Sequence, residues 1–440
     1  MTKATAALVV TGASLLAAPA LAAPALASPA LLAHQAPLLI DNAATGWILT
    51  STALVLLMTL PGLALFYGGM VRKKNIISVL AQSAAAFAIV SVLWFLVGYS
   101  LSFGQGPEAV NGLIGGVQAA FLNGVTANTA HSLLPGLPEL LFVAFQMTFA
   151  IITPALIAGA FAERMKFSAS ILFFVLWHLI VYAPICHQVW GGGYLGGLGV
   201  LDFAGGAVVH VNAGVAGLVC ALVLGPRHGF GRDNMAPANL AYSAIGTGLL
   251  LVGWIGFNAG SAGAADALAA VAAFNTILAA ASAAVGWMAV EWIERRRPTL
   301  LGLLSGIVGG LVAITPAAGF VDPKGAFFIG LIAGPACYAG AVWLKHALKY
   351  DDSLDAFGVH GVGGIVGALL TGLFATTSVN ALAEGATVWK QAVGLLGAIG
   401  WSAAGTYLVL TLCRFTTGLR VAKEQEIEGL DYTQHGEAIH

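Results

Sequence analysis

The chain has 440 residues, of which 59% are hydrophobic and only 8% carry a charged side chain. A typical soluble domain has about 25% charged residues, so this composition excludes a soluble enzyme, a nucleic-acid-binding protein and a disordered chain. The 57 glycines fit helices packed inside a bilayer, where small residues let neighbouring backbones approach. The net charge of −1 identifies no partner, but the positions of the charges along the chain are informative.

Residues 1–27 are predicted to form a secretory signal peptide. Lys3 supplies the positive charge, and the apolar stretch 4–16 is too short to span a hydrocarbon core about 30 Å thick. Two small-x-small cleavage sites follow, at 20–22 and 25–27. Cleavage would leave the mature N-terminus outside the membrane, and the alternative is a leader that stays attached.

Eleven apolar segments of membrane-spanning length follow this leader. They are expected to be helices, because a backbone in lipid has to satisfy its own hydrogen bonds, and they are too long and continuous for barrel strands. The sequence therefore predicts an all-α polytopic membrane protein, with a transmembrane domain over 28–413 and a C-terminal tail over 414–440. The predicted spans are 46–68, 75–99, 139–162, 168–190, 208–224, 239–260, 267–293, 299–318, 325–346, 357–375 and 389–413.

The basic residues predict the orientation of these spans. Fifteen of the 18 Lys and Arg residues follow odd-numbered helices, whereas only Lys324 and Lys390 follow even-numbered ones. Basic residues gather in cytoplasmic loops, so the mature N-terminus is expected outside and the C-terminus in the cytoplasm. A count of ten or twelve helices would place some of the basic clusters on the wrong side.

An internal repeat relates the two halves of the chain. His210 and His360 each begin the pattern H-x-x-x-G-x-x-G, and each follows an acidic residue, Asp202 or Asp355. The patterns are 150 residues and five predicted helices apart, and an odd offset makes the second half enter from the opposite side. We therefore expect an inverted repeat of five plus five helices, followed by an eleventh, with the functional site between the halves. Chance repetition in a Gly-rich chain is the alternative.

Histidines are the main titratable side chains inside the predicted spans. His210 and His360 are expected to meet in the core and to share one proton between ring nitrogens. Two histidines without a third ligand make a poor zinc site, so no metal and no cofactor is expected. His178 and His187 on helix 4 are interpreted as packing residues. The four cysteines lie in apolar stretches without a CxxC pair, which predicts neither disulfides nor a metal–thiolate site.

Asp202 and four aromatic residues are further candidates. Asp202 directly precedes helix 5, where a carboxylate caps a helix N-terminus and also attracts cations. Trp190 stands before three glycines, which suits a mouth where backbone and indole approach a small ligand. Phe145 and Phe149 share one helix face, and Phe257 lies among small residues at the end of helix 6. Taken singly, each aromatic also fits core or interfacial packing.

Together these stretches resemble the ammonium transporter family (Amt/Mep/Rh), and its bacterial Amt branch closely, from about residue 45 to the C-terminus. The matching motifs are PGLALFYGG (61–69), AFQMTFA (144–150), VWGGG (189–193), DFAGGxVVH (202–210), GWxGFNAGS (253–261) and FGVHG (357–361). The resemblance implies an eleven-helix fold in the bacterial inner membrane, a homotrimer with one pore per subunit, and a cytoplasmic tail.

The resemblance also implies roles by position. The family's functional residues fall on Phe145, Trp190 and Ser261 as an outer recognition site, Asp202 as the carboxylate below it, Phe149 and Phe257 as a stacked gate, and His210 and His360 as the twin histidines of the pore. The tail segment 418–431 resembles the part that communicates with PII-type signalling proteins. Met147 departs from the pattern, which has a small residue there, and so puts the local packing in question.

We therefore expect selective ammonium transport, in which a cation recruited at the aromatic site loses its proton and ammonia crosses an apolar pore. One alternative is an ammonium sensor that signals through its tail to a PII-type protein. Another is an Rh-like gas channel, against which the cation site at Trp190 and Ser261 argues. An intramembrane enzyme is not expected, because no nucleophile–base set and no metal cluster appears.

Overall fold

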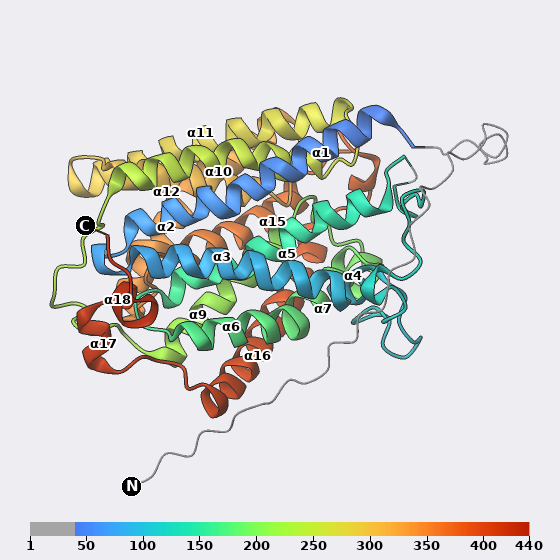
Figure 1. Ribbon diagram of the computed structural model, residues 1–440. Coiled ribbons are helices and arrows are strands. Elements are labelled where there is room, and N and C mark those ends of the chain that lie inside the picture. Colours follow the sequence, from blue (N-terminus) through green and yellow to red (C-terminus); the bar gives the residue numbers. More distant parts are fainter. Residues whose placement is uncertain (1–39, 135, 440) are drawn as a thin grey trace, which may run out of the picture. The chain divides into compact units, whose positions relative to one another are not determined.

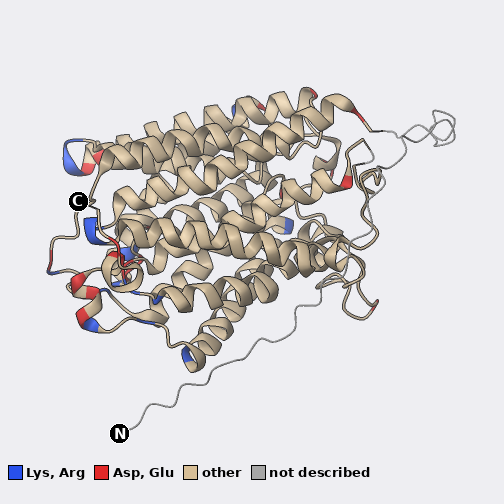
Figure 2. Cartoon of the chain, viewed as in Figure 1, with Lys and Arg blue, Asp and Glu red and all other residues tan. Residues whose placement is uncertain are grey.

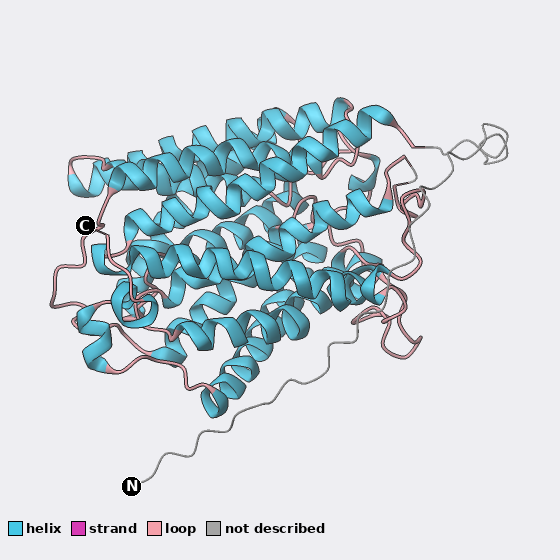
Figure 3. Ribbon diagram, in the orientation of Figure 1, coloured by secondary structure: helices cyan, strands magenta, loops and turns pink. Residues whose placement is uncertain are grey.

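The computed structural model describes residues 40–134 and 136–439 (Figure 1), and the predicted signal peptide lies outside them. Within these residues the chain folds into helices joined by loops and contains no strand (Figure 3). The prediction of an all-α polytopic membrane protein is confirmed.

The helices before residue 225 include short π-helical turns, written η here. They are α1 (Asn42–Leu57), η2 (Met58–Leu63), α2 (Ala64–Met70), α3 (Ile76–Leu93), η4 (Trp94–Gly98), α4 (Tyr99–Phe103), α5 (Glu139–Phe161), α6 (Phe167–Trp177), η6 (His178–Tyr182), α7 (Ala183–Val189), α8 (Tyr194–Gly197), η7 (Gly206–Val211) and α9 (Asn212–Leu224).

The helices after residue 225 include the two short helices of the tail, α17 and α18. They are α10 (Leu240–Gly260), α11 (Ala267–Arg295), α12 (Leu300–Ile314), α13 (Pro323–Tyr338), η8 (Ala339–Leu344), α14 (Lys345–Leu348), η9 (Phe357–Gly361), α15 (Val362–Phe374), α16 (Val388–Thr416), α17 (Lys423–Glu428) and α18 (Leu430–His435).

The structure supports ten of the eleven predicted spans by length. Among the described residues, ten helical runs are long and apolar enough to cross a bilayer, and several combine two α-helices through a π-helical turn. The remaining span, predicted over 299–318, corresponds to α12, which has only 15 residues. About 20 residues are needed to cross the hydrocarbon core. Buried against α11 and α13, α12 is largely shielded from lipid.

The two repeated patterns lie against each other in the core. Both repeat helices begin with a π-helical turn that contains the histidine, η7 before α9 and η9 before α15. A Cβ atom on Gly214 would overlap the backbone of Gly361, and one on Gly364 would lie 3.1 Å from the Gly206 carbonyl oxygen. The glycine four residues after each histidine therefore lets the two halves cross in backbone contact. This reciprocal packing explains the spacing of the repeat.

Charged residues gather at one end of the bundle (Figure 2), which we call the basic end. It includes the segments that follow α2, α5, α9 and α11, with Arg72, Arg164, Arg227 and Arg295, together with the tail. Tail helix α18 packs against α3 at this end. The opposite end carries the long segment between α4 and α5, where the candidate site opens.

Candidate functional site

A cavity of about 180 Å³ opens at the end of the bundle opposite the basic end. It brings together Phe145 from α5, Trp190 from the end of α7 and Ser261 from the end of α10, as predicted from their motifs. None of its described lining residues carries a formal charge. The lining residues are Ile48, Phe103, Leu133, Leu134, Leu137, Phe142, Phe145, Gln146, Trp190, Phe203, Gly260, Ser261 and Gly263.

Hydrogen bonds fix the polar groups of this cavity. The Ser261 hydroxyl donates to the carbonyl oxygen of Phe257 at 2.8 Å, so its own lone pairs stay free to accept. The Trp190 indole N–H donates to the carbonyl oxygen of Asp202 at 2.8 Å, which holds the ring at the cavity wall. The arrangement offers aromatic faces and one hydroxyl acceptor to a cation.

Two stacked phenylalanines lie directly behind the aromatic lining of the cavity. The rings of Phe149 and Phe257 stack with centroids 4.1 Å apart and an interplanar angle of 27°, and both side chains are fully buried. Phe145 and Trp190 meet Phe149 edge-on, at centroid distances of 5.0 and 6.0 Å. The predicted outer recognition site and the predicted phenylalanine gate therefore form one continuous aromatic cluster.

His210 and His360 lie directly beyond this stack. The His210 ring is 6.0 Å from the Phe257 ring, and the two imidazoles approach with their Nδ1 atoms 3.3 Å apart. Since a neutral imidazole has one donor and one acceptor nitrogen, one Nδ1 donates and the other accepts. Within the described residues the Nε2 atom of His210 has no hydrogen-bond partner. The structure therefore brings the two histidines into contact, as the repeat suggested.

Trp254 belongs to this site, although the sequence alone suggested no role for it. Its ring stacks on His210 with centroids 5.2 Å apart, and its indole N–H donates to the Thr315 hydroxyl at 2.9 Å. The sequence feature that could have identified Trp254 is its position one helical turn before Phe257 on α10. Trp254 orients His210 by covering one face of the imidazole.

Asp202 caps the turn that leads to His210. Its carboxylate accepts four backbone N–H groups, those of residues 205 to 208, at 2.5–3.0 Å. Gly205 has a φ of +113°, a left-handed conformation that strongly favours glycine, and this bend wraps the backbone around the carboxylate. The predicted capping role is confirmed, and the DFAGG motif is its local cause.

In the second half, Asp352 takes the place that Asp202 has in the first. The sequence-based pairing of Asp202 with Asp355 is therefore wrong. The Asp352 carboxylate accepts the N–H groups of Ala356 and Phe357 at 3.1 and 2.7 Å, at the start of η9. Asp355 instead pairs with Lys345. Asp352 also stands eight residues before its histidine, as Asp202 does. Capping requires that distance, whereas Asp355 is too close to the helix start.

His178 of η6 and His187 of α7 have packing roles. His178 is fully buried and stacks on Tyr182 with centroids 5.5 Å apart. The ring nitrogens of His187 lie 3.1 and 2.6 Å from the carbonyl oxygens of Ser102 and Asn111, and so tie α7 to the segment after α4. Met147 is half-buried against the core without displacing Phe145 or Phe149.

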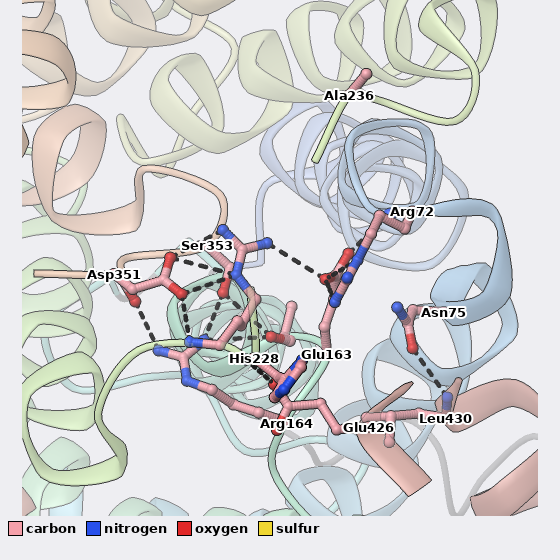
Figure 4. A network of polar contacts seen from close by, with 12 residues as sticks. Arg72, Asn75, Glu163, Arg164, His228, Ala236, Asp351, Ser353, Glu426 and Leu430 are labelled. Carbon is pink, nitrogen blue, oxygen red and sulfur yellow. Dashed lines mark hydrogen bonds and ion pairs between the residues drawn. The ribbon is translucent and has the colours of Figure 1, made fainter. Parts of the chain in front are cut away.

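A buried ionic network joins the loops at the basic end (Figure 4). Glu163 pairs with Arg72 at 2.7 Å and with Arg227 at 3.4 Å, and Arg227 in turn pairs with Asp351 at 2.8 Å. Arg164 donates to the carbonyl oxygen of Asp351 at 2.6 Å. Although burial raises the pKa of Asp351, the hydrogen bonds and charge of Arg227 hold that pKa below its ordinary value. The sequence analysis used the arginines only as topology signals and assigned no role to Glu163 or Asp351.

The tail is joined to this network through Arg164, whose carbonyl oxygen accepts the N–H of Val421 at 3.1 Å. Glu426 of α17 pairs with Arg420 at 2.8 Å and accepts the N–H of His228 at 2.5 Å. The N–H of Leu430 donates to Asn75, and the carboxylate of Asp431 accepts from Ser78 (Figure 4 shows the first of these contacts). The tail is therefore bound to the loops that follow α2 and α9.

The described residues contain no group of three His, Cys, Asp or Glu side chains close enough together to hold a metal ion. All four cysteines are buried and free, in agreement with their assignment as packing residues.

Comparison with known proteins identifies close relatives over most of the chain. Residues 46–439 match the sequence profile of the Ammonium Transporter Family. An ammonium transporter of Bacillus subtilis is 49% identical over 398 residues, which cover 87% of this chain and 95% of that protein. An ammonium transporter of Aquifex aeolicus is 47% identical over 414 residues, covering 92% and 95% of the two chains.

Solved structures with the same fold are also found. The crystal structure of Saccharomyces cerevisiae Mep2 superimposes with a TM-score of 0.81 at 38% identity, and covers 88% of this chain and 89% of that chain. A structure described as a sensor Amt protein superimposes with a TM-score of 0.82 at 32% identity, covering 90% and 98%.

Proposed function

The chain belongs to the ammonium transporter family, and from this premise we propose that it carries ammonium selectively through a pore of its own. The single observation that supports this pathway most strongly is the continuous line of side chains through the bundle. It runs from the uncharged aromatic cavity, through the stacked phenylalanines, to the hydrogen-bonded histidine pair.

Recognition takes place in the cavity. Ammonium and potassium are similar in size and hydration, so size alone does not separate them. Aromatic faces attract a cation by about 0.5–2 kcal/mol each. Ammonium also donates directional hydrogen bonds, and the Ser261 hydroxyl accepts one because its own proton is engaged by Phe257.

Selection follows from deprotonation at the floor of the cavity. Removing the remaining water from a cation in an apolar pore costs several kcal/mol at least. Desolvation also lowers the pKa of a cationic acid, so ammonium gives up its proton to the neutral histidine pair beyond the stack, whereas potassium has no proton to give. Neutral ammonia then passes Phe149 and Phe257, and the bare ion is excluded.

His210 and His360 act as the proton relay of the pore. The 3.3 Å contact between their Nδ1 atoms defines one donor and one acceptor, so a proton gained at one ring is passed to the other. When His210 is the ring that donates from Nδ1, its free Nε2 is the acceptor nitrogen and takes a hydrogen bond from ammonia. Trp254 keeps the His210 ring in the orientation that both contacts require.

Current recording on purified protein in liposomes tests the proposal. Pulses of ammonium or methylammonium are expected to drive transport, whereas potassium and sodium pulses are not. Ser261→Ala should weaken the apparent affinity for ammonium, while Ser378→Ala, at an exposed serine after α15, should not. Potassium flux equal to ammonium flux through the intact protein would refute selection by deprotonation.

The proposed setting is the bacterial inner membrane, with the cavity and the mature N-terminus outside and the basic end in the cytoplasm. The distribution of Lys and Arg supports this orientation. We propose a homotrimer, as the family resemblance implies, that binds a PII-type protein through the loops and tail of the basic end. Co-purification from cells after a nitrogen shock tests this partner. Finding no PII protein with either the wild type or a deletion of 418–440 would contradict it.

A sensor is the second candidate function, because one of the structurally similar proteins is described as a sensor Amt protein. A sensor would bind ammonium at the cavity and signal through the tail, which the network at the basic end links to the membrane helices. Ammonium binding without any ammonium-driven current would favour this function over transport.

A further inference from the structure

The cavity is larger and more apolar than an ammonium ion requires. A site for one water-sized molecule needs only about 10–15 Å³, and this cavity has about 180 Å³. Beside the aromatic wall, its second wall consists of the aliphatic side chains Ile48, Leu133, Leu134 and Leu137. Aliphatic carbon offers an ammonium ion neither a hydrogen-bond acceptor nor a π face, so recognition of the ion itself does not account for this wall.

The leucine wall is a built feature of the fold. The N–H of His131 donates to the carbonyl oxygen of Leu137 at 3.0 Å, and the N–H of Leu134 donates back to that of His131 at 3.2 Å. The His131 ring stacks on Phe142 of α5 with centroids 3.6 Å apart. These contacts hold Leu134 and Leu137 against the cavity, whereas Leu133 stands at its rim and is 65% exposed.

The leucine wall directly adjoins the proposed cation site. The Leu134 side chain lies across Gly263, where an added Cβ would be 3.0 Å from both of its methyl groups. Gly263 is two residues from Ser261. A ligand with an ammonium head at Ser261 and Trp190 would therefore lay a chain of a few carbons along Leu134.

We propose that the cavity binds primary alkylammonium ions of about three to four carbons, and that these ions block the pore. This inference rests on the proposed function, because it uses the same site for the cationic head. The head keeps the N–H groups and charge that the hydroxyl and aromatic rings recognise, and the chain displaces water from the leucines. The chain does not follow ammonia inward, because the stacked, fully buried rings of Phe149 and Phe257 would have to part much further for three or four carbons than for ammonia.

Inhibition of the ammonium current measures this binding. Methylammonium, n-propylammonium and n-butylammonium are added on the cavity side of proteoliposomes, with n-butanol as the uncharged analogue of the same chain. Each buried methylene should strengthen binding by about fourfold, so n-butylammonium is expected to block at concentrations at least tenfold below those at which methylammonium competes. n-Butanol should not block at these concentrations.

A matched pair of variants locates the chain. Leu134→Ala should reduce the ratio of the methylammonium to the n-butylammonium inhibition constant by about fivefold or more, because most of the contact with the chain is lost. Leu382→Ala, at an exposed leucine in the 3₁₀ turn Ala381–Ala383 outside the cavity, should leave that ratio unchanged. The ratio cancels any general effect of a variant on folding or turnover.

Thermal stabilisation of the detergent-solubilised protein by the same ions separates this inference from the proposed function. A normal ammonium current with n-butylammonium no more potent than methylammonium would overturn the inference and leave the transport function intact. Equal loss of potency in both leucine variants, or passage of n-butylammonium through the pore, would also overturn it. Absence of ammonium current, with stabilisation by n-butylammonium that Leu134→Ala weakens, would refute transport and support the cavity assignment.

Discussion

Replacing Asp202 with alanine tests the connection between the fold and the outer site. The carboxylate accepts four backbone N–H groups, and the side chain is only 7% exposed. A buried donor without a partner costs about 1–3 kcal/mol. Four such donors at the low end of this range predict a loss of roughly 4 kcal/mol of unfolding free energy. That is a large part of the 5–15 kcal/mol typical of folded proteins.

Asp352 provides the matched control for this substitution. It caps the corresponding helix start in the second half, but it accepts only two N–H groups and lies at the basic end of the bundle. Asp352→Ala is therefore expected to destabilise the protein by about half as much. Only Asp202 also fixes the cavity wall, through the bond from the Trp190 indole to its carbonyl oxygen.

Thermal unfolding in detergent and ammonium current in liposomes give the two readouts. Asp202→Ala should unfold at the lowest temperature and lose most of its current, and Asp202→Glu should retain part of both. Asp352→Ala should leave the apparent affinity for external ammonium close to that of the wild type. An Asp202→Ala protein that unfolds at the wild-type temperature and transports at the full rate would refute both the capping and the cation-attracting roles.

The histidine pair and the ionic network give two further predictions. Replacing both His210 and His360 with leucine should abolish the ammonium current. Single changes of either histidine to glutamate should keep ammonium flux but admit potassium. Because the pair shares one proton, the effects of the single changes should not add. Additive effects on current, with potassium leak unchanged in all variants, would identify two independent packing residues. Asp351→Asn should lower the free energy of unfolding by about 3 kcal/mol at pH 7, because it breaks a buried pair with Arg227. Since the pKa of Asp351 is lowered in the folded state, its stabilising effect is complete above about pH 4 and is lost as the pH falls further. The free energies of unfolding of variant and wild type, measured by chemical unfolding, should therefore converge in acid. An equal difference at all pH values would contradict this ion pair.

Local sequence determined the helical spans and the histidine pair. All eleven spans were placed from apolar length, because lipid leaves the backbone no partner other than its own helix, and only the span of α12 is shorter than predicted. His210 and His360 could be paired because the repeat has a fixed offset and small residues follow each histidine at the same spacing. Both inferences need only composition and period, which the linear sequence contains in full.

The counterpart of Asp202 illustrates what the sequence left open. Asp352 and Asp355 both precede the second repeat helix, and only the path of the backbone decides which carboxylate reaches the free N–H groups. The stacking of Trp254 on His210 likewise depends on how α10 crosses η7. A crossing angle is a property of two packed surfaces, and neither surface encodes it alone.

The leucine wall and the network at the basic end were decided by tertiary structure entirely. Leu133, Leu134 and Leu137 lie in a segment without helical or strand periodicity, and they become part of the site only because His131 stacks on α5. Glu163 and Asp351 are 188 residues apart and meet through Arg227. The bilayer imposes a strong periodic pattern on the segments that cross it, whereas contacts between loops depend on long-range packing that leaves no such pattern in the sequence.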